Sequence, residues 1–131
     1  PPPPAPPSPP PAPASPSPPG PAQEGEARRL LEAGRYAEAA AAFAAALREK
    51  RAAYTVDVEV ACQPETIAKG LQAAGGDERF IVLPYDLKGR PCFRVIWGLY
   101  PDRASAEAAL AELPAFFKQN ASPRVASWKR P

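Results

Sequence analysis

The chain has 131 residues, with 16 Lys and Arg against 14 Asp and Glu, no histidine and no methionine. Its net charge of +2 disfavours nucleic-acid binding, because phosphate recognition relies on a concentrated basic surface. Without histidine a Ser or Cys nucleophile lacks its customary base, and two cysteines cannot hold zinc unaided. We therefore expect no catalytic activity, no cofactor and no metal site.

Residues 1–21 read PPPPAPPSPPPAPASPSPPGP, with 14 prolines and otherwise only Ala, Ser and Gly. This composition predicts a disordered linker with polyproline II character. A ligand for SH3 or WW domains is the alternative, disfavoured because no Arg or Lys flanks the run. Since the chain starts inside a proline run without Met, we expect a piece of a longer protein. Any signal peptide or membrane anchor would lie outside it, and no apolar run here is long enough to span a bilayer.

Residues 22–52 predict two short helices that form a hairpin, with a break at Gly34. Their apolar residues recur at helical spacing: Leu30, Leu31, Tyr36, Ala39, Phe43, Ala46 and Leu47. The G-x-Y-x-E-A junction formed by Gly34, Tyr36, Glu38 and Ala39 resembles a single tetratricopeptide repeat. A lone hairpin cannot bury its apolar face by itself. We therefore expect it to pack on the following domain or on a partner.

Residues 53–131 form a second unit in which strands alternate with helices. The pattern predicts strands at 54–61, 79–87, 91–100 and 123–130, and helices at 63–76 and 103–120. The resulting order is β-α-β-β-α-β. We therefore predict an α+β fold of the split β-α-β type (ferredoxin/RNP-like), with an antiparallel sheet ordered 4-1-3-2 and both helices on one face.

A tight turn at Lys88 and Gly89 sets the predicted pairing of the second and third strands. It places Leu83 opposite Arg94, Ile81 opposite Ile96, and Tyr85 near Cys92, all on one sheet face. The other face, toward the helices, would then carry Phe80, Val82, Phe93, Val95 and Trp97. By this parity Trp97 belongs to the core rather than to a ligand site.

Two stretches of the second unit resemble the SPOR domain, a bacterial peptidoglycan-binding module: YTVDVEV and CFRVIWGLYPDRASAEAALAEL. In register with the family's third-strand corner are Phe93, Val95, Gly98, Tyr100, Arg103, Glu107 and Ala108. The resemblance covers nearly all of residues 54–130. It implies non-catalytic binding of glycan strands stripped of their stem peptides, on the sheet face opposite the helices, in the periplasm or cell envelope. The chain departs from the family at Asp57, which replaces a glutamine, and at Cys92, which replaces an aromatic of some members.

The resemblance and the predicted pairing give a set of candidate glycan-binding residues: Asp57, Glu59, Leu83, Tyr85, Arg94, Ile96 and Trp128. Apolar side chains would form the base of a sugar-binding groove, while Asp57, Glu59 and Arg94 would supply hydrogen bonds. The alternative is that the helical hairpin covers this face as structure, since a strand that is apolar on both sides usually has both faces covered. Asp57 and Glu59 could suggest the paired carboxylates of a glycosidase. We favour the simpler interpretation that they are solvated carboxylates on a strand face.

A second function remains open, in which the hairpin and the sheet face bind an envelope protein. An RNA-binding domain of similar topology is disfavoured, because the aromatic signature of that fold is absent from the third strand.

Cys62 and Cys92 are predicted to form a disulfide. In the 4-1-3-2 order the first and third strands are antiparallel neighbours, so the end of the first lies beside the start of the third, where the two cysteines sit. An oxidising compartment such as the periplasm would permit the bond. The alternative is a pair of small buried thiols that happen to lie close together.

Overall fold

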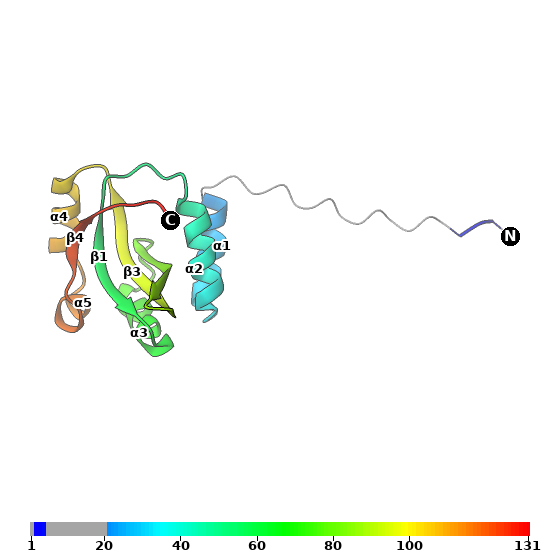
Figure 1. Cartoon of the computed structure of the whole chain (residues 1–131), viewed down its shortest axis with the longest axis horizontal. Helices are drawn as coiled ribbons and strands as arrows, with labels where there is room; N and C mark the ends of the chain where they lie inside the picture. Colours follow the sequence, from blue (N-terminus) through cyan, green and yellow to red (C-terminus); the bar gives the residue numbers. More distant parts are fainter. Residues whose placement is uncertain (1, 5–20) are drawn as a thin grey trace.

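The computed structural model describes residues 2–4 and 21–131. The predicted linker therefore lies almost entirely outside the described residues. Residues 21–131 contain, in chain order, α1 (Pro21–Glu32), α2 (Tyr36–Leu47), β1 (Tyr54–Ala61), α3 (Pro64–Ala74), β2 (Phe80–Leu87), β3 (Arg90–Tyr100), α4 (Arg103–Ala111), α5 (Ala115–Asn120) and β4 (Arg124–Ser127). Figure 1 shows β1 and β3 between α4 and α5 on one side and the α1–α2 hairpin on the other.

The four strands form one antiparallel sheet in the order β2-β3-β1-β4, so the predicted α+β class and sheet order are confirmed. The pairing of β2 with β3 also has the predicted register, with Ile81 opposite Ile96 and Leu83 opposite Arg94. Lys88 and Gly89 both have positive φ, 52° and 84°. This conformation suits a two-residue hairpin turn, whose twist matches that of the strands and fixes their register.

The first face of the sheet packs against α3, α4 and α5. Its aromatic centre consists of Phe80, Trp97 and Phe117, all buried. The ring of Phe117 lies 6.1 Å from that of Phe80 and 5.6 Å from that of Trp97, measured between centroids. The prediction that Trp97 is a core residue is therefore confirmed.

The last part of the chain differs from the prediction in two boundaries. The single helix expected over 103–120 is divided into α4 and α5, because Pro114 cannot continue the hydrogen-bond ladder of a helix. The last strand spans only Arg124–Ser127, shorter than the predicted 123–130. The start of α4 is as expected: Asp102 caps it by accepting a hydrogen bond from the Ser105 N–H at 2.7 Å.

Two irregularities interrupt the ladder between β1 and β3, one between Thr55 and Asp57 and one between Asp57 and Glu59. At the first, the extra residue is on β3, where Gly98 has a φ of 78°. The buried Thr55 hydroxyl donates to the Gly98 carbonyl at 2.7 Å. At the second, Glu59 rather than Val58 stands opposite Val95, so β1 holds one extra residue. A bulge of this kind moves the residues after it to the other face.

The helical hairpin packs along β2, an edge strand of the sheet. Arg28 of α1 donates to the carbonyl of Phe80 at 2.8 Å and to that of Glu78 at 2.6 Å. Its guanidinium also lies 5.3 Å from the ring centre of Phe43. Burial lowers the pKa of Arg28, opposed by the nearby Glu78. The hairpin thus packs on the following domain, one of the two outcomes expected from the sequence.

Candidate functional site

The second face of the sheet carries an ion pair at its centre. Asp57 on β1 accepts a hydrogen bond from Arg94 on β3 at 3.1 Å, and both side chains are partly buried. Charge-assisted hydrogen bonds of this kind are stronger than neutral ones and hold both side chains in place. Asp57 and Arg94 were both predicted for this face, and the structure brings them together.

Three apolar side chains on this face are exposed to solvent. Val60, which pairs with Arg94 across the ladder, is 42% exposed, and Tyr85 and Leu87 are 39% and 40% exposed. Tyr85 and Leu87 alternate with Leu83 along β2 and so share its face. Within the described part of the chain, Tyr85 is the one aromatic residue in the exposed class. We call Asp57, Val60, Tyr85, Leu87 and Arg94 the open end of the second face.

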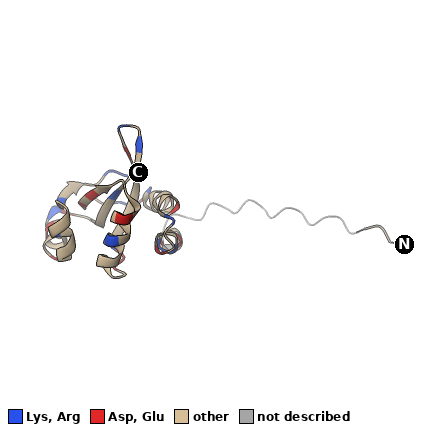
Figure 2. Cartoon of the chain, turned by 90° about the horizontal axis from the view of Figure 1, so that it is seen from below, with Lys and Arg blue, Asp and Glu red and all other residues tan. Residues whose placement is uncertain are grey.

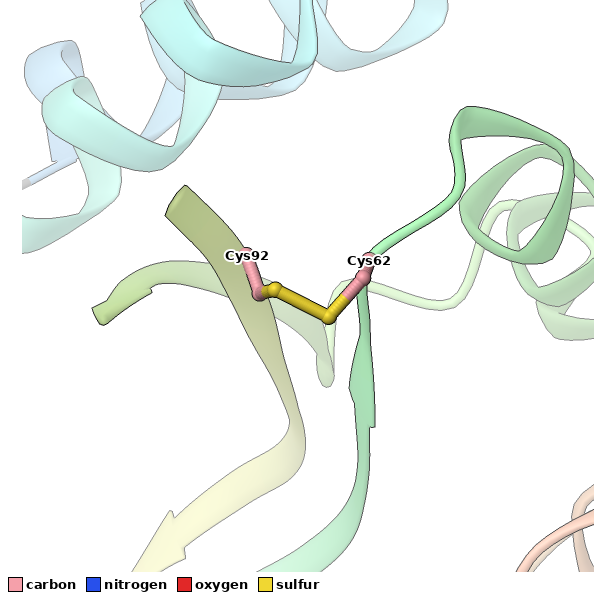
Figure 3. The surroundings of a disulfide bond; sticks show 2 residues. All are labelled: Cys62 and Cys92. Carbon is pink, nitrogen blue, oxygen red and sulfur yellow. A yellow bond between two sulfur atoms is a disulfide. The ribbon is translucent and has the colours of Figure 1, made fainter. Parts of the chain in front are cut away.

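A disulfide ties the strands together at this open end. The sulfur atoms of Cys62 and Cys92 are bonded, and their Cα atoms lie 4.4 Å apart. Figure 3 shows Cys62 just beyond β1, where the chain turns toward α3, and Cys92 on β3. Cys92 stands opposite Tyr85 in the ladder. The predicted disulfide is therefore present, and it fixes the backbone next to the exposed tyrosine.

Three of the predicted glycan-binding residues are buried instead. Leu83 is 6%, Ile96 0% and Trp128 8% exposed, and all three belong to the hydrophobic core. Ile81 on the same face lines a cavity of about 270 Å³ with Arg28 and Phe43 of the hairpin. On the β2 side of this face, the helical hairpin therefore covers the sheet as structure, which was the alternative to a sugar groove. On this face the open end is accessible to solvent, whereas Leu83 and Ile96 are not.

Glu59 differs most from its predicted place. The regular alternation of β1 put it on the same face as Asp57, but the bulge turns it toward α3 and α5. There it lines a cavity with Thr66 and Lys69 of α3 and with Phe117 of α5. The two carboxylates of β1 therefore face opposite sides of the sheet. The same bulge brings Val60 to the open end.

An apolar groove adjoins the open end at the β2 edge. Its volume is about 500 Å³, and its lining consists of Ala37, Pro84, Tyr85, Asp86, Pro91, Cys92 and Phe93. Ala37 belongs to α2, so the groove is formed jointly by the helical hairpin and by strands β2 and β3. No sequence pattern indicates this groove, because it depends on where the hairpin packs against β2. Tyr85 is common to the groove and to the open end.

Within residues 2–4 and 21–131, no group of three or more His, Cys, Asp or Glu side chains is placed to hold a metal ion. No helix in the same part of the chain is both long and apolar enough to cross a membrane. The disulfide is consistent with an extracytoplasmic, oxidising location. Comparisons with protein-family models, with curated proteins and with solved structures find no match.

Proposed function

We propose that this chain is a non-catalytic module, similar to SPOR domains, that binds peptidoglycan glycan strands denuded of stem peptides. The exposed Tyr85 beside the Asp57–Arg94 pair is the observation that carries the proposal. A sugar ring has an apolar face, which packs on an aromatic side chain, and polar edges, which need hydrogen-bond donors and acceptors. An exposed tyrosine next to a fixed carboxylate and guanidinium supplies both.

The distribution of charge and the burial of side chains restrict which ligands and which contacts are compatible with this site. In Figure 2 basic and acidic residues are interspersed over the helices and the sheet, an arrangement that does not favour a dense polyanion such as nucleic acid. Since Leu83 and Ile96 are buried, the proposed contacts reduce to Asp57, Tyr85 and Arg94, with Val60 as additional apolar surface. A short binding platform of this kind fits one or two sugar units rather than a long stretch of glycan.

The cellular location is part of the same proposal. We place the module in the periplasm or cell envelope, where glycan strands occur and where the Cys62–Cys92 disulfide persists. Contact with a membrane would be made only through an anchor elsewhere in the protein.

A pull-down on purified sacculi tests the proposal. Wild-type protein should bind sacculi, and more of it should bind after amidase treatment, which removes the stem peptides. Tyr85→Ala should weaken binding about tenfold, the loss expected for one aromatic contact with its buried area. Arg94→Ala should have a similar effect. Arg103→Ala, an exposed arginine on α4, is the matched control and should bind like wild type.

Thermal melts of the same variants distinguish lost contacts from lost folding. Tyr85→Ala should melt within a few degrees of wild type, because its side chain is partly exposed already. If both variants fold and bind amidase-treated sacculi as strongly as wild type, the open end is not a glycan site.

The apolar groove favours a second candidate function, the binding of an envelope protein. Its lining is almost entirely apolar and includes both α2 and β3 residues, which suits an apolar peptide segment better than a sugar. Ala37→Glu would place a charge in the groove at the exposed first turn of α2, where a carboxylate is compatible with the helix dipole. If the groove is the functional surface, this variant should lose its envelope partner while sacculus binding is unchanged.

A further inference from the structure

The cavity that receives Glu59 lies on the opposite face of the sheet from the proposed glycan site. It has a volume of about 210 Å³ and is bounded by Glu59 of β1, Thr66 and Lys69 of α3, and Phe116, Phe117 and Asn120 of α5. Figure 1 shows α3 and α5 at the same lower end of the molecule, to which β1 runs. Three elements far apart in the sequence thus meet around one small cavity.

The charged groups of this cavity have no partners in the described part of the protein. Glu59 and Lys69 take part in none of the hydrogen bonds or ion pairs found among those residues, and they do not pair with each other. Burial alone raises the pKa of Glu59, which means that its carboxylate has lost water without gaining a counterion. Glu59 is partly buried and Lys69 is exposed, so both keep contact with solvent, and a ligand cation at Glu59 would replace the part of its hydration that burial removes.

Apart from Asn120, the remaining wall is apolar, and its aromatic residues pack against the hydrophobic core. Phe117 is buried, with the rings of Phe80 and Trp97 behind it. Phe116 is half-buried and meets Phe117 edge-on, with the ring planes at 84°. The cavity therefore combines a carboxylate, an ammonium group, the Thr66 hydroxyl and an aromatic corner.

We propose that this cavity binds a free α-amino acid with a small aliphatic side chain. The ammonium group of the ligand would lie at the Glu59 carboxylate, and its carboxylate at the Lys69 ammonium and the Thr66 hydroxyl. The aliphatic side chain would pack against Phe116 and Phe117. An anion alone would be repelled by Glu59 and a cation alone by Lys69, whereas a zwitterion satisfies both.

The size of the cavity agrees with this ligand class. The volume of about 210 Å³ leaves room for a small amino acid. A small cavity of this kind suits a single small molecule better than an extended glycan or peptide. The inference does not depend on glycan binding, because the two sites are on different faces and share no residue.

Titration of the full chain with valine, followed by ¹H–¹⁵N NMR, tests the proposal. We expect saturable shifts at the amides of Glu59, Thr66, Lys69 and Phe117, with a dissociation constant of about 1 mM or tighter. N-acetylvaline lacks the ammonium group and valinamide lacks the carboxylate, so each should bind at least about tenfold more weakly. Both enantiomers of valine are titrated, because the cavity outline does not select one in advance.

Variants of the charged residues complete the test. Glu59→Gln and Lys69→Met should each weaken valine binding about tenfold or more, while the amide spectrum stays that of a folded protein. Glu65→Gln on the exposed first turn of α3 and Lys129→Met at the exposed C-terminal end are matched controls that should bind normally. No saturable shift at these amides, or equal shifts with valine and N-acetylvaline, overturns the inference.

Discussion

Removal of the Cys62–Cys92 disulfide is the perturbation whose size follows most directly from the structure. The two cysteines are 30 residues apart in the sequence. In the chain-entropy model, closing a loop of that length in the unfolded chain stabilises the fold by about 3.6 kcal/mol. Unfolding of residues 21–131 should carry an entropy of about 0.23 kcal/mol/K. Loss of the bond should therefore lower the melting temperature by about 15 °C.

The assay is thermal unfolding by circular dichroism of wild type with and without reductant, beside the double variant Cys62→Ser/Cys92→Ala. The oxidised wild type should melt about 15 °C above the variant. Reduced wild type should melt close to the variant, because it differs only in two small side chains. Reductant should not change the variant. A difference of less than about 4 °C between oxidised wild type and the variant would refute the loop-closure argument.

Two further predictions concern the hairpin and Glu59. Deleting residues 1–52 should leave a fragment that still folds but melts at least about 10 °C lower, because Ile81 and Leu83 lose their cover and each buried aliphatic side chain is worth about 1.5–3 kcal/mol. Equal melting temperatures would show that the hairpin contributes nothing to stability. Burial raises the pKa of Glu59, so the folded protein binds this proton more tightly than the unfolded chain, and stability falls as the pH rises above the ordinary glutamate pKa. Glu59→Gln should therefore raise the melting temperature at about pH 7 and leave it unchanged at about pH 3; a variant that is no more stable than wild type at the higher pH would contradict the assigned burial cost.

Much of the sheet could be predicted because its signals are local. The turn at Lys88 and Gly89 fixes the register of β2 and β3 through backbone geometry alone. The element order then leaves few allowed topologies, and the correct one places Cys62 beside Cys92. Pro114 also marks the end of a helix in the sequence, so the division into α4 and α5 was predictable, although one continuous helix was expected.

The predicted placement of the site residues was less accurate. On β1 the difference comes from one extra residue, the bulge between Asp57 and Glu59. The alternation of YTVDVEVA is regular, and it predicts one face for Asp57 and Glu59. The bulge between them separates the two carboxylates. The alternation of apolar and polar residues predicts which sheet face a side chain lies on only where the strand has no bulge. Whether a bulge occurs depends on the pairing with the neighbouring strand, and not on the strand alone.

The amino-acid sequence by itself determined the strands, the helices, their order, the tight turn and the pairing of the cysteines, because each depends on neighbours along the chain or on the few topologies that such an order permits. Only the tertiary structure decided which part of the second face stays open. Leu83 and Ile96 are buried and Tyr85 is exposed, although all three are equally suited to a binding face by their position in a strand. Their burial depends on where α2 and Arg28 meet β2. Periodicity marks the apolar face of each segment, but it does not determine where two faces distant in sequence meet.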